Sequence, residues 1–341
     1  MPQVWHARRE RKRLCKTSQR PTMIRDGTKQ VAGSRRRSIM ILVAGGTGFV
    51  GGGIVRELAR RGKQFAVLTR DAARSAERFP GLAVEYREGD VRDPSSLEAA
   101  IAGVSSVIGC QQFPNSPIEN PGKGHTFEEV DARGTENLVI AAKAAAAQQY
   151  IYLSAVGAAP EGYHWFRAKW RAEQAVRNSG LTYAILRPSW VYGPEDSALN
   201  RFLAMSRFQP FVPLIGAVGK QMMQPVFVDD VGRATAECLD NPAATSETFE
   251  LGGPEVLSMS DVVRTALEVA GRHRLLLPAP TFVMKALASI VQFAPGRPLT
   301  PDAIDFITMD ALGDPADISE KLGLTPTPLR DGLATYLTKR D

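Results

Sequence analysis

The hydrophobic pattern predicts that a parallel α/β sheet begins near residue 40. Residues 38–44 (SIMILVA) form an almost continuous apolar run, which is the pattern of a strand buried on both faces of a parallel sheet. A glycine-rich turn follows, and then Val50, Ile54 and Leu58 recur at four-residue intervals, which predicts a helix with one apolar face. Residues 65–69 (FAVLT) predict the next strand, so the segment closes a βαβ unit.

The turn after the first strand has the glycine spacing of a dinucleotide-binding loop. Gly45, Gly48 and Gly51 are spaced G-x-x-G-x-x-G. Glycines at such a turn allow a tight bend, a close approach of the backbone to a pyrophosphate, and close packing of helix on strand. The helix that follows presents free N–H groups and a partial positive charge to that pyrophosphate. We therefore expect NAD(P) to be bound by Gly45, Thr47, Gly48, Phe49, Val50 and Gly51.

The residues after the second strand discriminate between the two nicotinamide cofactors. An acidic residue there binds the ribose hydroxyls of NAD and repels a 2′-phosphate. This chain has Arg70 followed by Asp71, with Arg74 one turn later. Because a guanidinium binds a phosphate with two parallel hydrogen bonds, the sequence favours NADP(H) over NAD(H). The alternative is that Arg70 is a solvated surface charge and Asp71 serves the ribose.

A third strand is predicted at residues 83–86, and it leads into a turn that contains Asp90 and Val91. Ligands of open α/β sheets lie outside the carboxyl ends of the strands, so we expect Asp90 and Val91 to contact the adenine. Asp93 is expected to cap a helix that begins at Pro94.

Charge is distributed unevenly along the chain. The net charge is +6, but residues 1–39 alone carry +10, so the remainder is mildly acidic and gives no reason to expect nucleic-acid binding. The basic segment 1–39 lacks a periodic apolar pattern and is predicted to be disordered. It is interpreted either as a targeting arm for anionic surfaces or as an untranslated stretch before a true start at Met40.

Three scattered cysteines and four scattered histidines predict neither a metal site nor disulfides, which fits a cytoplasmic protein.

Several motifs together resemble a known family. They are residues 41–51 (ILVAGGTGFVG), 130–138 (VDARGTENL), 150–155 (YIYLSA) and 186–194 (LRPSWVYGP). Their order and spacing are similar to those of atypical (extended) short-chain dehydrogenase/reductases, the NAD(P)-dependent epimerase/dehydratase group. Residues 188–196 (PSWVYGPED) and 251–254 (LGGP) resemble the branch with the 39-kDa accessory subunit of respiratory complex I (NADH:ubiquinone oxidoreductase) and its bacterial relatives.

The resemblance implies an architecture. Residues 40–193 are expected to form a Rossmann domain with a doubly wound parallel sheet, and residues 194–341 mainly a smaller C-terminal substrate lobe. Residues 225–255 are expected to return to the Rossmann domain. Pro188 is expected to lie beside the cofactor.

The resemblance also marks the catalytic positions. Enzymes of this family use a Ser or Thr, a Tyr that exchanges the proton, and a Lys four residues after that Tyr. Ser154 and Lys169 match the hydroxyl residue and the lysine, and Lys169 is expected to hold the nicotinamide ribose. Trp165, which cannot exchange a proton, stands four residues before Lys169. Tyr163 is six residues before Lys169, off its helical face, and is therefore a weak substitute.

The leading functional hypothesis is an NAD(P)(H)-binding, reductase-like protein whose dinucleotide serves structure or sensing, or slow redox chemistry on a lipophilic quinone- or isoprenoid-like substrate. One alternative is an active sugar epimerase/dehydratase or carbonyl reductase. The other is an interaction subunit of a membrane respiratory complex, peripheral to the inner face of the membrane. The oligomeric state is expected to be a monomer or homodimer.

Two apolar segments of the predicted lobe suggest specific roles. Residues 208–216 are predicted to be an apolar loop that lines a pocket for a hydrophobic ligand. Residues 280–295 contain the single charge Lys285, and we favour a core helix with Lys285 reaching outward over a helix that lies on a membrane or a partner.

Overall fold

The computed structural model describes residues 40–216, 221–294 and 299–337. The expectations for residues 1–39, disorder or a start at Met40, fall outside these ranges.

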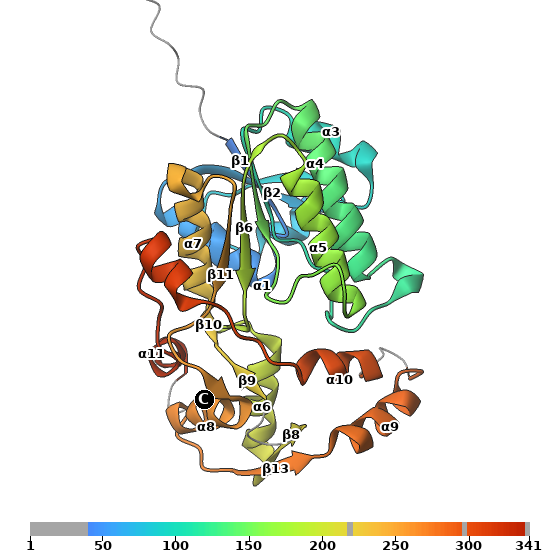
Figure 1. Cartoon of the computed structure of the whole chain (residues 1–341), viewed down its shortest axis with the longest axis vertical. Helices are drawn as coiled ribbons and strands as arrows, with labels where there is room; N and C mark the ends of the chain where they lie inside the picture. Colours follow the sequence, from blue (N-terminus) through green and yellow to red (C-terminus); the bar gives the residue numbers. More distant parts are fainter. Residues whose placement is uncertain (1–39, 217–220, 295–298, 338–341) are drawn as a thin grey trace, which may run out of the picture. The chain divides into compact units, whose positions relative to one another are not determined.

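A seven-stranded parallel sheet forms the centre of the described chain (Figure 1). Its strand order is β11-β6-β5-β4-β1-β2-β3, and every neighbouring pair is parallel. The order reverses between β1 and β4, as in a doubly wound Rossmann sheet, so the predicted fold class is confirmed. The strands are β1 (Met40–Ala44), β2 (Gln64–Thr69), β3 (Glu85–Glu88), β4 (Ser106–Gly109), β5 (Gln149–Leu153), β6 (Thr182–Pro188) and β11 (Glu247–Leu251).

Helices cover both faces of this sheet (Figure 1). One face packs against α3 (Pro94–Ile101), α4 (Gly134–Ala144) and α5 (His164–Arg177). The other packs against α1 (Phe49–Arg60) and α7 (Val228–Asp240). The third strand was expected at 83–86 but spans Glu85–Glu88, because β3 is a half-exposed edge strand whose polar residues carry little hydrophobic signal.

Glycines bring α1 and α7 into close contact. A Cβ added at Gly53 would lie 2.8 Å from the Val228 side chain, and one added at Gly232 would lie 2.9 Å from the Gly53 carbonyl oxygen. Only glycine fits at both positions, because real Cβ atoms do not approach other heavy atoms so closely. This contact holds α1, the helix that follows the glycine turn, against α7.

The chain between β6 and β11, and after β11, builds a further group of elements with its own apolar core. The strands are β7 (Val191–Tyr192), β8 (Phe211–Ile215), β9 (Met222–Met223), β10 (Val226–Phe227), β12 (Leu257–Ser258) and β13 (Leu275–Ala279). The helices are α6 (Ser197–Phe208), α8 (Met259–Val269), α9 (Thr281–Val291), α10 (Pro301–Ile307) and α11 (Leu329–Ala334). Short helical segments complete the described ranges: α2 (Ala72–Ala76), η1 (Pro121–Lys123), η2 (Phe127–Arg133), η3 (Pro242–Ala244) and η4 (Asp317–Lys321).

Two expectations for this region are wrong. Most of the apolar run 208–216 is not a loop but strand β8, which pairs in parallel with β13 and thereby satisfies its backbone. The helix α9 is not a core helix with Lys285 pointing outward. Lys285 instead pairs with Asp305 of α10, while Phe282 and Ile290 are 75% and 73% exposed.

Candidate functional site

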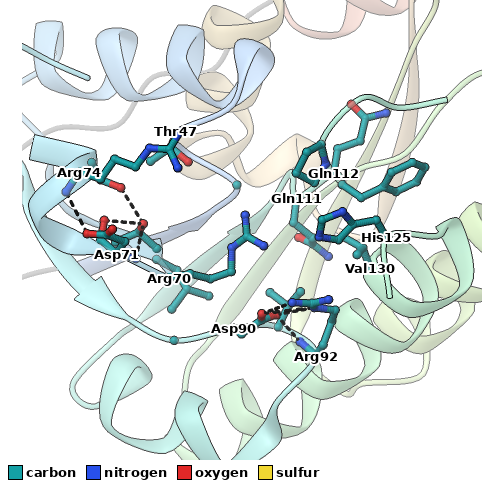
Figure 2. A pocket seen from close by; sticks show the side chains of 18 of the residues that line it. Thr47, Arg70, Asp71, Arg74, Asp90, Arg92, Gln111, Gln112, His125 and Val130 are labelled. Atoms are coloured by element: carbon teal, nitrogen blue, oxygen red, sulfur yellow. Dashed lines mark hydrogen bonds and ion pairs between the residues drawn. The ribbon is translucent and has the colours of Figure 1, made fainter. Parts of the chain in front are cut away.

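A cavity of about 590 Å³ lies at the carboxyl ends of β1, β2, β3 and β4, where the Rossmann rule places a ligand (Figure 2). It extends from the glycine turn after β1 to the turns after β2 and β3. Its lining is mainly polar and basic on one side, and includes Phe113 and Val130 on the other. The polar lining residues are Thr47, Thr69, Arg70, Asp71, Arg74, Ser75, Arg78, Asp90, Arg92, Gln111, Gln112 and His125.

Backbone geometry explains the spacing of the three loop glycines. Gly45 has φ +87°, a left-handed conformation that favours glycine, and a Cβ there would lie 2.5 Å from the Cα of Gln111. A Cβ at Gly51 would lie 2.1 Å from the Gly45 carbonyl oxygen. Gly48 donates its N–H to that same carbonyl at 3.0 Å. The turn is therefore folded tightly on itself.

The first turn of α1 is left open to a ligand. Gly48 is the N-cap residue, no side chain in the described ranges caps the helix, and its first turn holds no acidic residue. The backbone N–H groups at a helix start carry a partial positive charge and attract anions. The loop therefore has the chemistry that a pyrophosphate requires.

Arginines dominate the side of the cavity that follows β2. Arg70 is exposed and its side chain reaches into the cavity (Figure 2). Asp71 is engaged elsewhere, because its Oδ1 accepts the Arg74 N–H at 2.9 Å and so caps α2. One oxygen of this carboxylate is thus held at the start of α2, while the side chain of Arg70 is directed toward the ligand space.

Arg78 was missed by the sequence reasoning. Its Nε donates to the Thr47 carbonyl in the glycine loop at 3.1 Å, and its guanidinium also pairs with Glu195. Burial lowers the pKa of Arg78, and the nearby Arg56 lowers it further. The signal available in the sequence was the recurrence of arginine at residues 70, 74 and 78, although α2 spans only Ala72–Ala76 and so does not carry all three on one helical face.

Asp90 and Val91 line the cavity, and both are fixed by neighbours. Burial alone would raise the pKa of Asp90, but hydrogen bonds from Arg92 outweigh it and hold the pKa below its usual value. The closest contact joins Arg92 Nη2 to Asp90 Oδ2 at 2.6 Å. The Val91 carbonyl accepts a hydrogen bond from Asn137 Nδ2 at 2.8 Å. Asp93 caps α3 through the Ser95 N–H at 3.1 Å, as expected from the sequence.

Ser154 is directed away from the cavity. It directly follows β5, it is buried, and its hydroxyl donates to Glu173 Oε1 at 2.6 Å. Glu173 is fully buried and also accepts two hydrogen bonds from Arg187, at 2.8 and 2.7 Å. The hydroxyl is therefore part of a buried ionic network.

Lys169 is also held by neighbours within the fold. Its ammonium lies 2.7 Å from Asp131 Oδ1 and donates to the Leu153 carbonyl at 3.3 Å. It also lies 5.5 Å from the centre of the Tyr152 ring. Burial raises the pKa of Asp131, and the adjacent Lys169 ammonium opposes that shift. The pair lies outside the described cavity lining.

The two aromatic residues before Lys169, Tyr163 and Trp165, pack against each other. Trp165 is buried, and Tyr163 stacks on it with ring centres 4.3 Å apart and planes 8° apart. Phe306 of α10 packs edge-on against Trp165 at 5.5 Å. Tyr163 precedes the first residue of α5 and is 45% exposed. Trp165 therefore fills the position four residues before Lys169 on α5, and its side chain cannot exchange a proton.

Of the cofactor residues expected from the sequence, the cavity brings together Gly45, Thr47, Arg70, Asp90 and Val91. Its lining does not include Gly48, Phe49, Val50, Gly51, Lys169 or Pro188. Pro188 ends β6, and its carbonyl accepts the Val156 N–H at 3.2 Å. The described residues contain no group of three or more metal-ligating side chains.

The fold and the glycine loop define a class, and comparison with known families agrees. Residues 45–242 match the family described as NAD(P)H-binding, so the chain belongs to that family. Within it, the chain is of the complex I 39-kDa subunit type, and the resemblance expected from the sequence is confirmed.

Two relatives carry that conclusion. The chain is 30% identical over 309 residues to NADH dehydrogenase [ubiquinone] 1 alpha subcomplex subunit 9, mitochondrial, of Arabidopsis thaliana, covering 86% of this chain and 75% of the relative. It is 28% identical over 304 residues to the NADH-ubiquinone oxidoreductase 40 kDa subunit, mitochondrial, of Neurospora crassa, covering 86% and 78%.

A solved structure shows the same fold. The NADPH-dependent quinone oxidoreductase of Escherichia coli, complexed with NADPH, has a TM-score of 0.66 and 19% sequence identity. The similarity covers 87% of this chain and 99% of that one.

Proposed function

We propose that this protein binds NADP(H) in preference to NAD(H), with the adenosine half in the cavity and the 2′-phosphate beside Arg70. The observation that carries the proposal is the cationic side of the cavity, where Arg70 faces the ligand space and one oxygen of Asp71 caps α2. Arg74 and Arg78 add positive charge on the same side. A phosphate at that place is stabilised by charge-assisted hydrogen bonds, whereas an unmodified ribose gains little from them.

The positions proposed for the pyrophosphate and the adenine agree with this position of the 2′-phosphate. The pyrophosphate is proposed to lie against the N–H groups of the glycine loop and the first turn of α1, from Gly45 to Gly51. The adenine is proposed to contact Asp90 through its amino group and Val91 through its ring face, with Lys169 and Pro188 on the nicotinamide side.

The test is a pair of fluorescence titrations, with NADPH and with NADH, on the full chain and on Arg70→Ala. The variant is expected to lose about 10- to 100-fold in NADPH affinity, the range for removal of a charge-assisted hydrogen bond, and little in NADH affinity. Arg264→Ala is a matched control, because Arg264 is an exposed arginine of α8 paired with Asp261, outside the cavity. Equal losses for both nucleotides, or none, would refute the proposed 2′-phosphate contact.

We propose further that the bound dinucleotide serves structure or sensing, and not rapid carbonyl chemistry. Three groups support this: Ser154 donates to Glu173, Lys169 pairs with Asp131, and Trp165 replaces the tyrosine. A bound nicotinamide supplies a hydride, but none of these side chains is placed to supply the matching proton. Slow reduction of a lipophilic quinone-like acceptor, which can take its proton from water, is compatible with this arrangement. An active epimerase or carbonyl reductase is the less supported alternative.

A role as an interaction subunit of a membrane respiratory complex is a third proposal, with the protein peripheral to the membrane on its cytoplasmic side. The names of the relatives as complex I subunits support it.

We also propose the division into a Rossmann domain at 40–193 and a lobe at 194–341. The position of β11 next to β6 supports the return of residues 225–255 to that domain.

A further inference from the structure

The helix α9 exposes its large apolar side chains. Phe282 is 75% exposed and Ile290 is 73% exposed, and Phe293, just after the helix, is 84% exposed. Of the residues of α9, only Ala288 is buried. A soluble helix normally turns such side chains toward a core, so this face lacks a partner within the described chain.

The exposed apolar surface continues onto the neighbouring elements. Leu275 of β13 pairs in register with Phe211 of β8, and both are exposed. Phe208, at the end of α6, is 89% exposed, and the Leu275 N–H donates to the Pro210 carbonyl close by. In Figure 1, β8, β13 and α9 follow one another along the lower margin. We name this surface the apolar edge; it consists of Phe208, Phe211, Leu275, Leu277, Phe282, Val283, Leu287, Ile290 and Phe293.

The one charged residue of α9 does not share this face. Lys285 pairs with Asp305 of α10 at 2.5 Å, on the side of the helix that packs against its neighbour. The outer face of α9 is therefore uncharged. With 11 residues, α9 is also far too short to cross a bilayer, and the described ranges hold no helix long and apolar enough to do so.

The chain that forms the apolar edge carries only positive charge. Residues 197–216 and 270–294 contain no Asp or Glu. Their arginines are Arg201, Arg207, Arg272 and Arg274, and their lysine, Lys285, is neutralised by Asp305 of α10. Arg272 and Arg274 are fixed at the end of α6, where they donate to the carbonyls of Leu203 and Ser206 at 2.6 and 2.8 Å. These cations lie near Phe208, next to the exposed apolar side chains.

We propose that the apolar edge docks on the surface of a lipid bilayer that contains anionic phospholipid, with Phe282, Ile290 and Phe293 inserted at the interface. Apolar side chains that enter the acyl boundary, together with cations that approach anionic headgroups, are the two terms that hold a protein on such a surface. The surface supplies both and contains no acidic group to repel the headgroups. A second copy of the chain is a poorer occupant, because pairing the edge with itself brings like charges together. This inference does not depend on the bound nucleotide.

The test is flotation of the full chain with vesicles of phosphatidylcholine alone and with mixed vesicles of phosphatidylcholine and phosphatidylglycerol. We expect binding to the mixed vesicles that weakens with added salt. The double variant Phe282→Ser, Ile290→Ser should bind about 100-fold more weakly, since each inserted side chain contributes about a factor of ten or more. Ile140→Ser is the matched control, because Ile140 is 67% exposed on α4, away from the edge.

Failure to float with either vesicle, or unchanged flotation of the double variant, would overturn the proposal. Thermal unfolding of each variant, which should match the unmodified protein, separates lost docking from lost folding. Sedimentation velocity without lipid tests the competing interpretation, in which the apolar edge binds a second copy of the chain. A dimer that the double variant converts to a monomer would show that the edge binds a second copy and would also overturn the proposal.

Discussion

The ammonium of Lys169 lies 2.7 Å from the carboxylate of Asp131, whose side chain is completely buried. In the family that this chain resembles, the matching lysine is expected to hold the nicotinamide ribose and to tune a tyrosine. Here its charge is compensated within the fold, and Trp165 stands where that tyrosine belongs. The pair therefore has a structural role whether or not Lys169 also reaches the cofactor.

Removal of Lys169 should cost stability. Lys169→Met leaves the Asp131 carboxylate buried without a counter-charge, and breaking a buried ion pair in this way costs about 3–5 kcal/mol. Urea unfolding followed by circular dichroism measures the loss. Adding Asp131→Asn to Lys169→Met should recover part of it, while Lys143→Met, at an exposed position of α4, should cost little. An unfolding free energy for Lys169→Met equal to that of the unmodified protein would contradict the structural role.

Tyr163 should not be needed for any redox turnover. Its ring stacks on Trp165, an arrangement that phenylalanine preserves. With NADPH and a soluble quinone analogue, Tyr163→Phe is therefore expected to leave the steady-state rate within about twofold of the unmodified rate, since a general acid normally contributes at least 100-fold. A measurable rate that disappears in Tyr163→Phe would show that this hydroxyl donates the proton.

The Asp90–Arg92 pair should give a pH-dependent contribution to stability. Hydrogen bonds from Arg92 overcome the effect of burial and hold the pKa of Asp90 below its ordinary 3.8. A carboxyl whose pKa is lower in the folded than in the unfolded protein stabilises the fold at pH values above its unfolded-state pKa. This stabilisation is lost as the pH falls through the lowered folded-state pKa.

Arg92→Gln should therefore lower the Tm at neutral pH by about 2 °C or more, with a smaller difference below about pH 3. Arg264→Gln, at an exposed pair, is the control. Scanning calorimetry at both pH values gives the comparison. A Tm difference that grows toward low pH would have the wrong sign for this account.

The glycine loop should tolerate no side chain at Gly51. A Cβ there would lie 2.1 Å from the Gly45 carbonyl oxygen, so Gly51→Ala must displace the loop and is expected to abolish dinucleotide binding. Gly62→Ala is the matched control, because Gly62 has φ +64° but open space around it. Its expected cost is about 1 kcal/mol of stability without loss of binding. Normal NADPH affinity in Gly51→Ala would show that the loop does not cradle the ligand.

The sequence predicted the first strand, the glycine turn and the first helix well because their signals are local. A buried strand, glycines at fixed spacing and a one-faced helix lie next to each other between Met40 and Arg60, and each has a short-range cause. The missing catalytic tyrosine was equally readable, since it depends only on the distance from Trp165 to Lys169 along one helix.

The features that escaped prediction depend on contacts between distant segments. Glu195 brings Arg78 to the glycine loop, and Glu173 captures Ser154, but neither partner is close in sequence. The pairing of β8 with β13 joins residues some sixty positions apart, so an apolar run that becomes a strand looked like a loop. The outward face of α9 was misjudged because periodicity shows that a helix has an apolar face and not where that face points.

The central claim is that the cavity after β1 and β2 holds a nicotinamide dinucleotide. Isothermal titration of NADPH into the purified full chain, after any copurified nucleotide has been removed and identified, tests it most directly. The account predicts saturable uptake at a single site. Absence of copurified nucleotide together with no measurable heat at millimolar NADPH would contradict it.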